Sequence, residues 1–284
     1  MELLWLPFSV ATIAFYGLGQ VFAKETRTRI SSANLLLILS ANIFIMWTVY
    51  FVVFRDPSVS FPMETWLLAA AAAGLSGAAY ITFYEALKHG KVSIVGTVAG
   101  AYAPWTVVLA LLFLGETMSL LDGIGVSLVV AAMLVFTYGG ENGERKTELL
   151  GIAFAVCSLF FWGTSAALAK DVMTEIGNTN FIGVYALVCP TIWVAYWFTT
   201  ERGRFERPKS NRWILELSMV CFAIGGITYY LAIQNGNVSI VSPITNLYPL
   251  LTIVVAKYRL KENLTLRQYA ALAMLLVSIL LISF

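Results

Sequence analysis

Long apolar runs recur along the whole chain and restrict the folds open to it. Each is about 20 residues long, the length of helix that crosses a bilayer core. They lie at 3–23, 32–54, 65–87, 92–114, 119–138, 149–169, 180–200, 213–234, 238–258 and 265–284. Only helices and closed barrels satisfy their backbone in lipid, and these runs lack the alternation of barrel strands. The sequence therefore predicts an all-α membrane protein with ten transmembrane helices.

The composition excludes several other classes of protein. Hydrophobic residues make up 59% of the 284 residues and charged residues 12%, about half the charge density of a soluble domain. The formal net charge of +2 is too small and too scattered to indicate a nucleic-acid partner. The cysteines Cys157, Cys189 and Cys221 lie far apart inside apolar runs. We expect all three to be buried, and we expect no metal site, cofactor or catalytic group.

The two halves of the chain repeat each other at a constant offset of 146 residues. Residues 3–138 align with 149–284 without a gap, with 31 identities in 136 positions. Chance would give roughly one identity in twelve in so biased a composition, so the repeat is real. The predicted organisation is a first five-helix repeat at 1–138, a linker loop at 139–148 and a second five-helix repeat at 149–284.

An odd number of spans in each repeat has a consequence for topology. The second copy enters the membrane from the opposite side, so the two copies form inverted repeats. Inverted repeats are characteristic of secondary transporters, whose substrate site lies at the repeat interface near the midplane.

Local features recur in both halves at this offset. An aromatic-glycine step precedes a lysine at Tyr16-Gly17 to Lys24 and at Trp162-Gly163 to Lys170. The third span of each half ends in a tyrosine motif, and Val-Ser-Ile-Val begins the next span. Residues 114–119 (LGETMS) have a weaker copy at 260–265. With the five-plus-five layout, these features resemble the EamA-like branch of the drug/metabolite transporter superfamily over essentially the whole chain.

The resemblance implies secondary transport of small organic solutes through a central cavity. Relatives of this kind carry amino acids and other metabolites, sugars and nucleotide sugars, or multidrug cations. The small multidrug branch has a membrane-embedded glutamate eight residues before the lysine. Tyr16 and Trp162 occupy that position here, which puts the proton-coupled cation mechanism of that branch in doubt.

Uncharged polar and aromatic side chains are the candidates for a binding site, because charges inside the spans are scarce. Asn246 lies between Pro243 and Pro249, and a proline frees a carbonyl that lipid tolerates only next to protein or water. The alternative is that these groups make interhelical hydrogen bonds and aromatic belts. The candidate substrate-binding residues are Tyr16, Gln20, Tyr80, Phe83, Tyr84, Tyr102, Trp105, Trp162, Tyr229, Tyr230, Thr245, Asn246 and Tyr248.

The few charged residues near the spans have simpler expected roles. Glu85 is the candidate for proton coupling if its helix end faces the cavity, but interfacial anchoring is the simpler role for it and for Lys170. Glu116 and Glu262 follow the fourth and ninth spans, and we expect each to cap the next helix. Without a carboxylate near mid-membrane, weak or no proton coupling is expected.

The sequence therefore predicts a secondary transporter that works by alternating access around a midplane cavity. The expected cargo is an amino acid or a similar amphipathic metabolite, moved by an exporter, exchanger or facilitator. A sugar or polyol carrier is the alternative within transport, and a solute receptor or scaffold is the alternative of another class. The expected partners are a small-molecule substrate and the lipid bilayer of the cell membrane, without nucleic acid, and a monomer suffices.

The orientation in the membrane stays open. The connections after the odd-numbered spans hold 16 of the 18 lysines and arginines, which places both termini outside by the positive-inside rule. The resemblance implies cytoplasmic termini.

Overall fold

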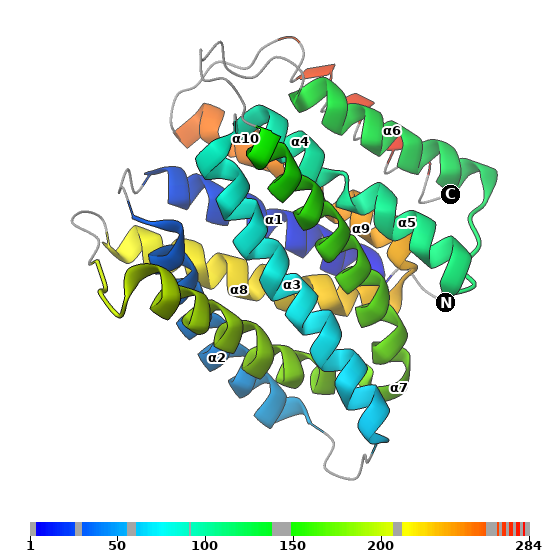
Figure 1. The fold of residues 1–284 in the computed structure, drawn as a ribbon. Helices are drawn as coiled ribbons and strands as arrows, with labels where there is room; N and C mark the ends of the chain where they lie inside the picture. The colour runs from blue at the N-terminus through cyan, green and yellow to red at the C-terminus, as the bar shows by residue number, and fades with distance from the viewer. Residues whose placement is uncertain are drawn as a thin grey trace.

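The computed structural model describes residues 4–25, 30–55, 61–90, 92–137, 149–206 and 212–259, with short pieces between 266 and 281. Every regular element among these residues is an α-helix (Figure 1). The helices are α1 (Trp5–Glu25), α2 (Ser32–Phe54), α3 (Met63–His89), α4 (Val92–Gly100), α5 (Tyr102–Phe113), α6 (Leu120–Thr137), α7 (Leu149–Glu201), α8 (Arg212–Asn235), α9 (Val238–Thr245) and α10 (Tyr248–Arg259).

Helices occupy every predicted span up to residue 258, and most of the last predicted span, 265–284, lies outside the described residues. Five of the described helices, α1, α2, α3, α7 and α8, are long and apolar enough to cross a membrane. The predicted all-helical membrane class is therefore confirmed, with three differences in how the spans are divided.

The first difference is in α7, where the sequence predicted two helices joined by a loop at 170–179. The chain instead stays helical from Leu149 to Glu201 except at Gly177, whose φ of 72° lies in the left-handed region. Glycine enters that region without steric cost. The chain turns there, so that residues 149–176 and 178–201 form two limbs of α7 (Figure 1).

The other two differences are breaks inside predicted single spans. The span at 92–114 divides into α4 and α5 around Ala101, and the span at 238–258 divides into α9 and α10 around Asn246. Proline has no N–H, so Pro104 leaves the carbonyl of Gly100 without a helical donor. The side chain of Asn246 supplies the missing donor, because its Nδ2 donates to the Gly100 carbonyl at 2.8 Å.

This contact also locates the symmetry axis of the fold. Gly100 and Asn246 are separated by 146 residues and are therefore repeat equivalents. In a two-fold arrangement a residue meets its own equivalent only close to the axis. The two helix breaks thus face each other at the pseudo-two-fold axis.

Pairs of reciprocal contacts elsewhere follow the same symmetry. Trp47 Nε1 donates to the Ala223 carbonyl at 2.8 Å, and its equivalent Trp193 donates to the Gly77 carbonyl, the equivalent of Ala223, at 3.0 Å. The hydroxyl pair Thr12–Thr228 at 2.9 Å is matched in the same way by Ser158–Thr82 at 2.8 Å. Each repeat therefore packs into the other, and the two-repeat architecture is confirmed.

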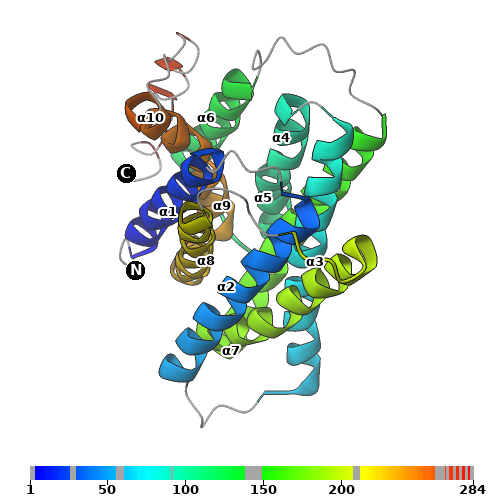
Figure 2. The same cartoon turned by 90° about the vertical axis from the view of Figure 1, so that its left-hand side faces the viewer.

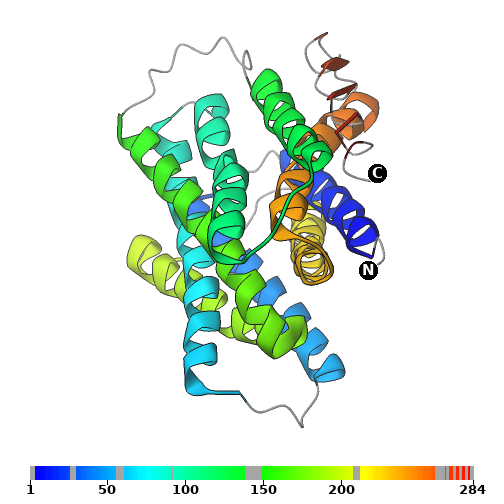
Figure 3. The same cartoon turned by 90° about the vertical axis from the view of Figure 1, so that its right-hand side faces the viewer.

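The interlocked repeats form two groups of helices. Figures 2 and 3 show α1, α6, α8, α9 and α10 gathered on one side, and α3, α4, α5 and the first limb of α7 on the other. α1 packs along α8, and α3 packs along α7. We call the first pair the α1–α8 wall, and we call α3 with the first limb of α7 the α3–α7 wall. The repeat operation exchanges the two walls.

Large apolar side chains are found both between the helices and on the outer surface, as expected of a membrane protein. Trp47, Trp193 and Phe181 are fully buried between helices, whereas large apolar side chains such as Phe113 and Val53 are exposed on the outside. Such a surface suits lipid. Cys189 and Cys221 are buried as predicted, but Cys157 is exposed. The prediction for Cys157 was wrong because an apolar run does not indicate which helix face meets lipid.

The reciprocal tryptophans give a test of the interlocked fold. Replacing Trp47 or Trp193 by Phe removes a buried hydrogen bond and leaves a cavity, so each change should cost about 1–3 kcal/mol. The measurement is thermal unfolding of the purified protein in detergent, with Trp213→Phe as the control because Trp213 is 64% exposed. Equal melting temperatures for all three variants would contradict this account of the packing.

Candidate functional site

A cluster of tyrosine rings lies where the two walls approach each other. The Tyr16 ring on α1 is 5.5 Å from that of Tyr248 on α10 and 6.0 Å from that of Phe222 on α8. These contacts join three helices of one group. Tyrosines of α3, α5 and α8 lie near Tyr16, namely Tyr80, Tyr102, Tyr229 and Tyr230.

Trp162 is the centre of the cluster on the α3–α7 wall. Its ring lies 5.1 Å from that of Tyr80, 5.4 Å from that of Phe83 and 5.9 Å from that of Tyr102. Tyr80 in turn lies edge-on to Trp193 at 5.2 Å. Edge-to-face pairs at these distances are favourable, so the rings hold one another in position.

The α1–α8 side of the cluster carries hydrogen-bonding groups. Thr252 Oγ1 on α10 donates to Gln20 Oε1 at 3.1 Å, and Gln20 also bonds the hydroxyl of Tyr248. The hydroxyls of Tyr229 and Ser242 lie 2.9 Å apart. Polar contacts therefore join α1 to α10 and α8 to α9 beside the rings.

Partial burial is a common property of these central rings. Most of them are only half-buried although they pack against one another. Tyr230 is the exception, because it is 5% exposed and packs against the buried rings of Trp47, Tyr185 and Phe181. The half-buried members are Tyr16, Tyr80, Phe83, Tyr84, Tyr102, Trp162, Tyr229 and Tyr248.

The cluster is built from repeat-equivalent positions. Its members pair at the offset of 146 residues as Tyr16 with Trp162, Phe83 with Tyr229, Tyr84 with Tyr230, and Tyr102 with Tyr248. The structure therefore brings ten of the thirteen candidate binding residues together, namely these eight with Tyr80 and Gln20.

The remaining three candidates take part in helix packing. Trp105 Nε1 donates to Thr164 Oγ1 at 3.2 Å, and its ring lies against Phe160. Thr245 is 2% exposed and bonds carbonyls of its own helix. Asn246 is 4% exposed, and its amide nitrogen bonds the Gly100 carbonyl at the axis.

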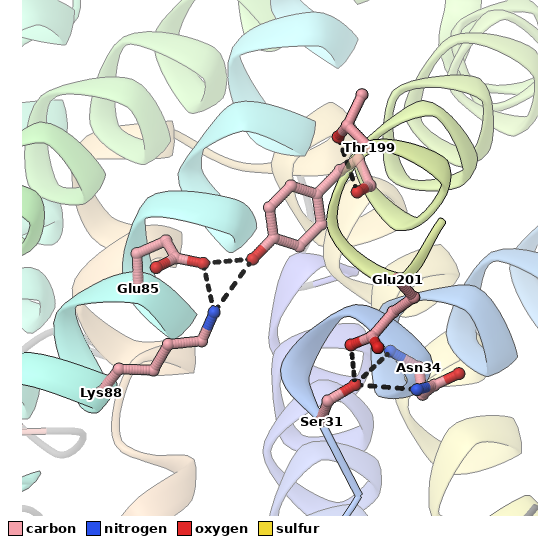
Figure 4. A network of polar contacts seen from close by, with 7 residues as sticks. Ser31, Asn34, Glu85, Lys88, Thr199 and Glu201 are labelled. Atoms are coloured by element: carbon pink, nitrogen blue, oxygen red, sulfur yellow. Dashed lines mark hydrogen bonds and ion pairs between the residues drawn. The ribbon is translucent and has the colours of Figure 1, made fainter. Parts of the chain in front are cut away.

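Glu85 lies near the end of α3, among contacts that join the repeats. It pairs with Lys88 Nζ at 2.5 Å and accepts a hydrogen bond from the Tyr196 hydroxyl on α7. Figure 4 shows this group beside a second junction, in which Ser31 Oγ at the start of α2 donates to Glu201 Oε1 at 2.5 Å. A role of Glu85 in coupling stays a prediction.

Glu116 corrects one prediction from the sequence. It does not cap α6, whose first turn is closed by reciprocal bonds between Ser119 and Asp122. Its two carboxylate oxygens instead accept from the backbone N–H groups of Val238 at 2.8 Å and Ser239 at 3.0 Å, so that it caps α9 of the other repeat. A free helix N-terminus attracts any carboxylate that the fold brings near, however distant in sequence.

Lys170 completes this contact between the repeats. Its Nζ donates to the carbonyls of Ile233 at 2.8 Å, in the last turn of α8, and of Gly236 at 2.9 Å, just after that helix. Anchoring at the membrane interface, the role expected from the sequence, does not account for these two hydrogen bonds. Together Glu116 and Lys170 hold the turn between α8 and α9 from both sides. Glu262, the equivalent of Glu116, lies outside the described residues.

Sequence reasoning missed several residues that support the cluster. Trp47 and Trp193 were visible as repeat identities, which could have marked them as structural. Tyr185, whose hydroxyl lies 2.9 Å from that of Ser76, carried no such signal because its equivalent is Leu39.

The sequence profile of the EamA-like transporter family matches residues 3–138 and again residues 149–284. The chain belongs to the EamA-like transporter family. It is therefore a multi-pass integral protein of the cell membrane in a family of transporters.

Two relatives carry names that fit this family. An uncharacterized transporter of Archaeoglobus fulgidus is 25% identical over 242 residues, which covers 83% of each chain. The uncharacterized transporter YvbV of Bacillus subtilis is 25% identical over 175 residues, and the match spans 61% of this chain but only 56% of that relative. A solved crystal structure superposes with a TM-score of 0.81 over 96% of this chain and 94% of the other, at 13% identity. That likeness shows the fold alone.

The contact at the axis of this EamA-family chain can be tested directly. Asn246→Leu leaves the carbonyl of Gly100 without a donor, which should cost about 1–3 kcal/mol of stability. Asn237→Ala is the matched control, since Asn237 is exposed and its side chain makes no capping bond. Thermal unfolding in detergent should rank the wild type and Asn237→Ala above Asn246→Leu. Identical unfolding of all three would show that the helix breaks do not depend on this bond.

Proposed function

We propose that this EamA-family protein is a secondary transporter that moves a small amphipathic metabolite, such as an amino acid, by alternating access. The observation that carries the proposal is the central cluster of half-buried tyrosine and tryptophan rings, contributed by both repeats. In this proposal the exposed parts of the rings line a solute cavity. Aromatic faces cover the apolar part of the solute, while hydroxyls and the Gln20 amide bond its polar part.

The broken helices support a site at this place. Tyr102 is the first residue of α5 and Tyr248 is the first residue of α10. The positive ends of two half-helix dipoles are therefore next to the cluster. Discontinuous helices whose ends meet at the midplane hold substrate groups in secondary transporters. A zwitterionic solute would find a favourable field for its carboxylate there.

The two walls provide the moving parts of the proposed cycle. They are exchanged by the repeat operation, and the Asn246–Gly100 contact lies on the axis of that operation. We propose ten spans in inverted topology, with the walls rocking about this contact. Glu85, Lys88 and Tyr196 join the repeats near one end, and Glu116 and Lys170 join them at the turn between α8 and α9.

The charge distribution supports exchange or facilitated diffusion rather than proton-driven pumping. The Tyr16, Tyr80 and Tyr102 rings pack against other aromatic rings rather than against charged groups. Glu85 is already paired with Lys88. A carboxylate held in this way gains little from taking up a proton.

Counterflow in proteoliposomes tests the function. Vesicles are loaded in turn with unlabelled amino acids, sugars or organic acids, and labelled uptake is followed with and without a pH gradient. We expect saturable counterflow of amino acids that the gradient does not change. Tyr248→Leu should lower the uptake about tenfold, the equivalent of about 1.4 kcal/mol of lost binding. Trp213→Leu on the exposed surface is the control and should leave uptake unchanged.

The other outcomes separate the alternatives. Counterflow of sugars alone would favour the sugar or polyol carrier. Uptake that requires the gradient would contradict the uncoupled mechanism and point to Glu85. Saturable binding without flux, by protein that elutes as a folded species, would contradict transport and favour a solute receptor.

A further inference from the structure

The two walls of the aromatic cluster are equivalent by symmetry but differ in chemistry. At one pair of equivalent positions, the α1–α8 wall has Tyr229 where the α3–α7 wall has Phe83. At another it has Gln20 where the α3–α7 wall has Ala166. In both pairs the hydrogen-bonding member belongs to the α1–α8 wall.

The larger aromatic side chains, in contrast, belong to the α3–α7 wall. The α3–α7 wall has the large indole of Trp162 where the α1–α8 wall has Tyr16, and it has Tyr80 where the other wall has Gly226. A side chain at Gly226 has no room, because a Cβ there would lie 2.4 Å from the Trp47 ring. Tyr80 packs edge-on against Trp162 at 5.1 Å and against Trp193 at 5.2 Å, so its ring is part of the aromatic surface of this wall.

This asymmetry has a consequence for any solute with two unlike ends. A site with true two-fold symmetry would accept such a solute equally well in two opposite orientations. Here one wall offers the hydrogen-bonding groups of Gln20 and Tyr229, and the other offers the three rings of Trp162, Tyr80 and Phe83. A polar end placed against the rings would leave its hydrogen bonds unmade, which disfavours that orientation.

We propose that the solute binds in one orientation, with its hydrogen-bonding end toward Gln20, Tyr16 and Tyr229 and its flat apolar end against Trp162, Tyr80 and Phe83. Gln20 and Tyr229 then determine the orientation, and Trp162 selects for the apolar end. The cargo class is a solute with one compact polar end and one flat, preferably aromatic, end. This inference rests on the proposed transport function.

Photolabelling reads the orientation directly. The probe is L-phenylalanine with a diazirine at the para position of its ring, irradiated with the reconstituted protein with and without excess unlabelled L-phenylalanine. Peptide mass spectrometry locates the labelled residues. We expect labelling that L-phenylalanine suppresses to fall on Trp162, Tyr80 and Phe83. Suppressible labelling concentrated on Tyr16, Gln20 and Tyr229, or divided equally between the walls, would overturn the inference.

A variant that removes one difference between the walls gives a second readout. Tyr229→Phe makes position 229 identical to its equivalent, Phe83, and deletes a single hydroxyl. It should raise the fraction of label on the α1–α8 wall about threefold, the effect of losing one hydrogen bond of modest strength. Trp213→Phe is the control for an aromatic change outside the cluster. A purely structural role of Tyr229 would lower total labelling and leave its distribution unchanged, which would also overturn the inference.

The two proposals fail in distinguishable ways. Counterflow of L-phenylalanine together with equal labelling of both walls would leave the transport function standing and overturn only the single orientation. Absence of both saturable L-phenylalanine uptake and suppressible labelling would contradict the proposed cargo class and this inference together.

Discussion

Backbone groups that lose their helical partners inside a membrane must find others within the protein, and the centre of this structure depends on that constraint. Pro104 deprives the Gly100 carbonyl of its donor, and no water in a bilayer core replaces it. Asn246 of the other repeat supplies the donor at 2.8 Å. Because these two residues are repeat equivalents, the bond joins the repeats at the pseudo-two-fold axis and allows two helices to break beside the central rings.

Reciprocal contacts between the repeats also occur away from the axis. The indole bonds of Trp47 and Trp193 run from each repeat to a backbone carbonyl of the other. Since the same contact occurs twice, the two walls have similar scaffolds and differ mainly in the side chains that face the centre. The framework is therefore symmetric while the candidate binding surface is not. In the proposed cycle, that separation would let a symmetric motion act on an asymmetric solute.

Much of this arrangement was predictable from the sequence, because hydropathy sets the helical segments and the offset of 146 residues sets the repeat. Tyr102 and Tyr248 could be placed together for the same reason. The partners of Trp47 and Glu116 could not, since a backbone carbonyl or N–H leaves no trace in the residue type. The flanking prolines marked Asn246 as unusual in the sequence. They did not reveal that its amide donates a hydrogen bond to the Gly100 carbonyl.

The central claim is that two equivalent walls rock about one axis, so that their opposite ends open in turn. Spin-label distances test it most directly, with one pair at Met63 and Gln234, where α3 begins and α8 ends, and another at Leu150 and Trp213, where α7 and α8 begin. All four side chains are exposed, and the three cysteines are replaced first. On addition of a transported solute to reconstituted protein, the two distances should change in opposite directions. Changes in the same direction, or no change at either end, would contradict the account.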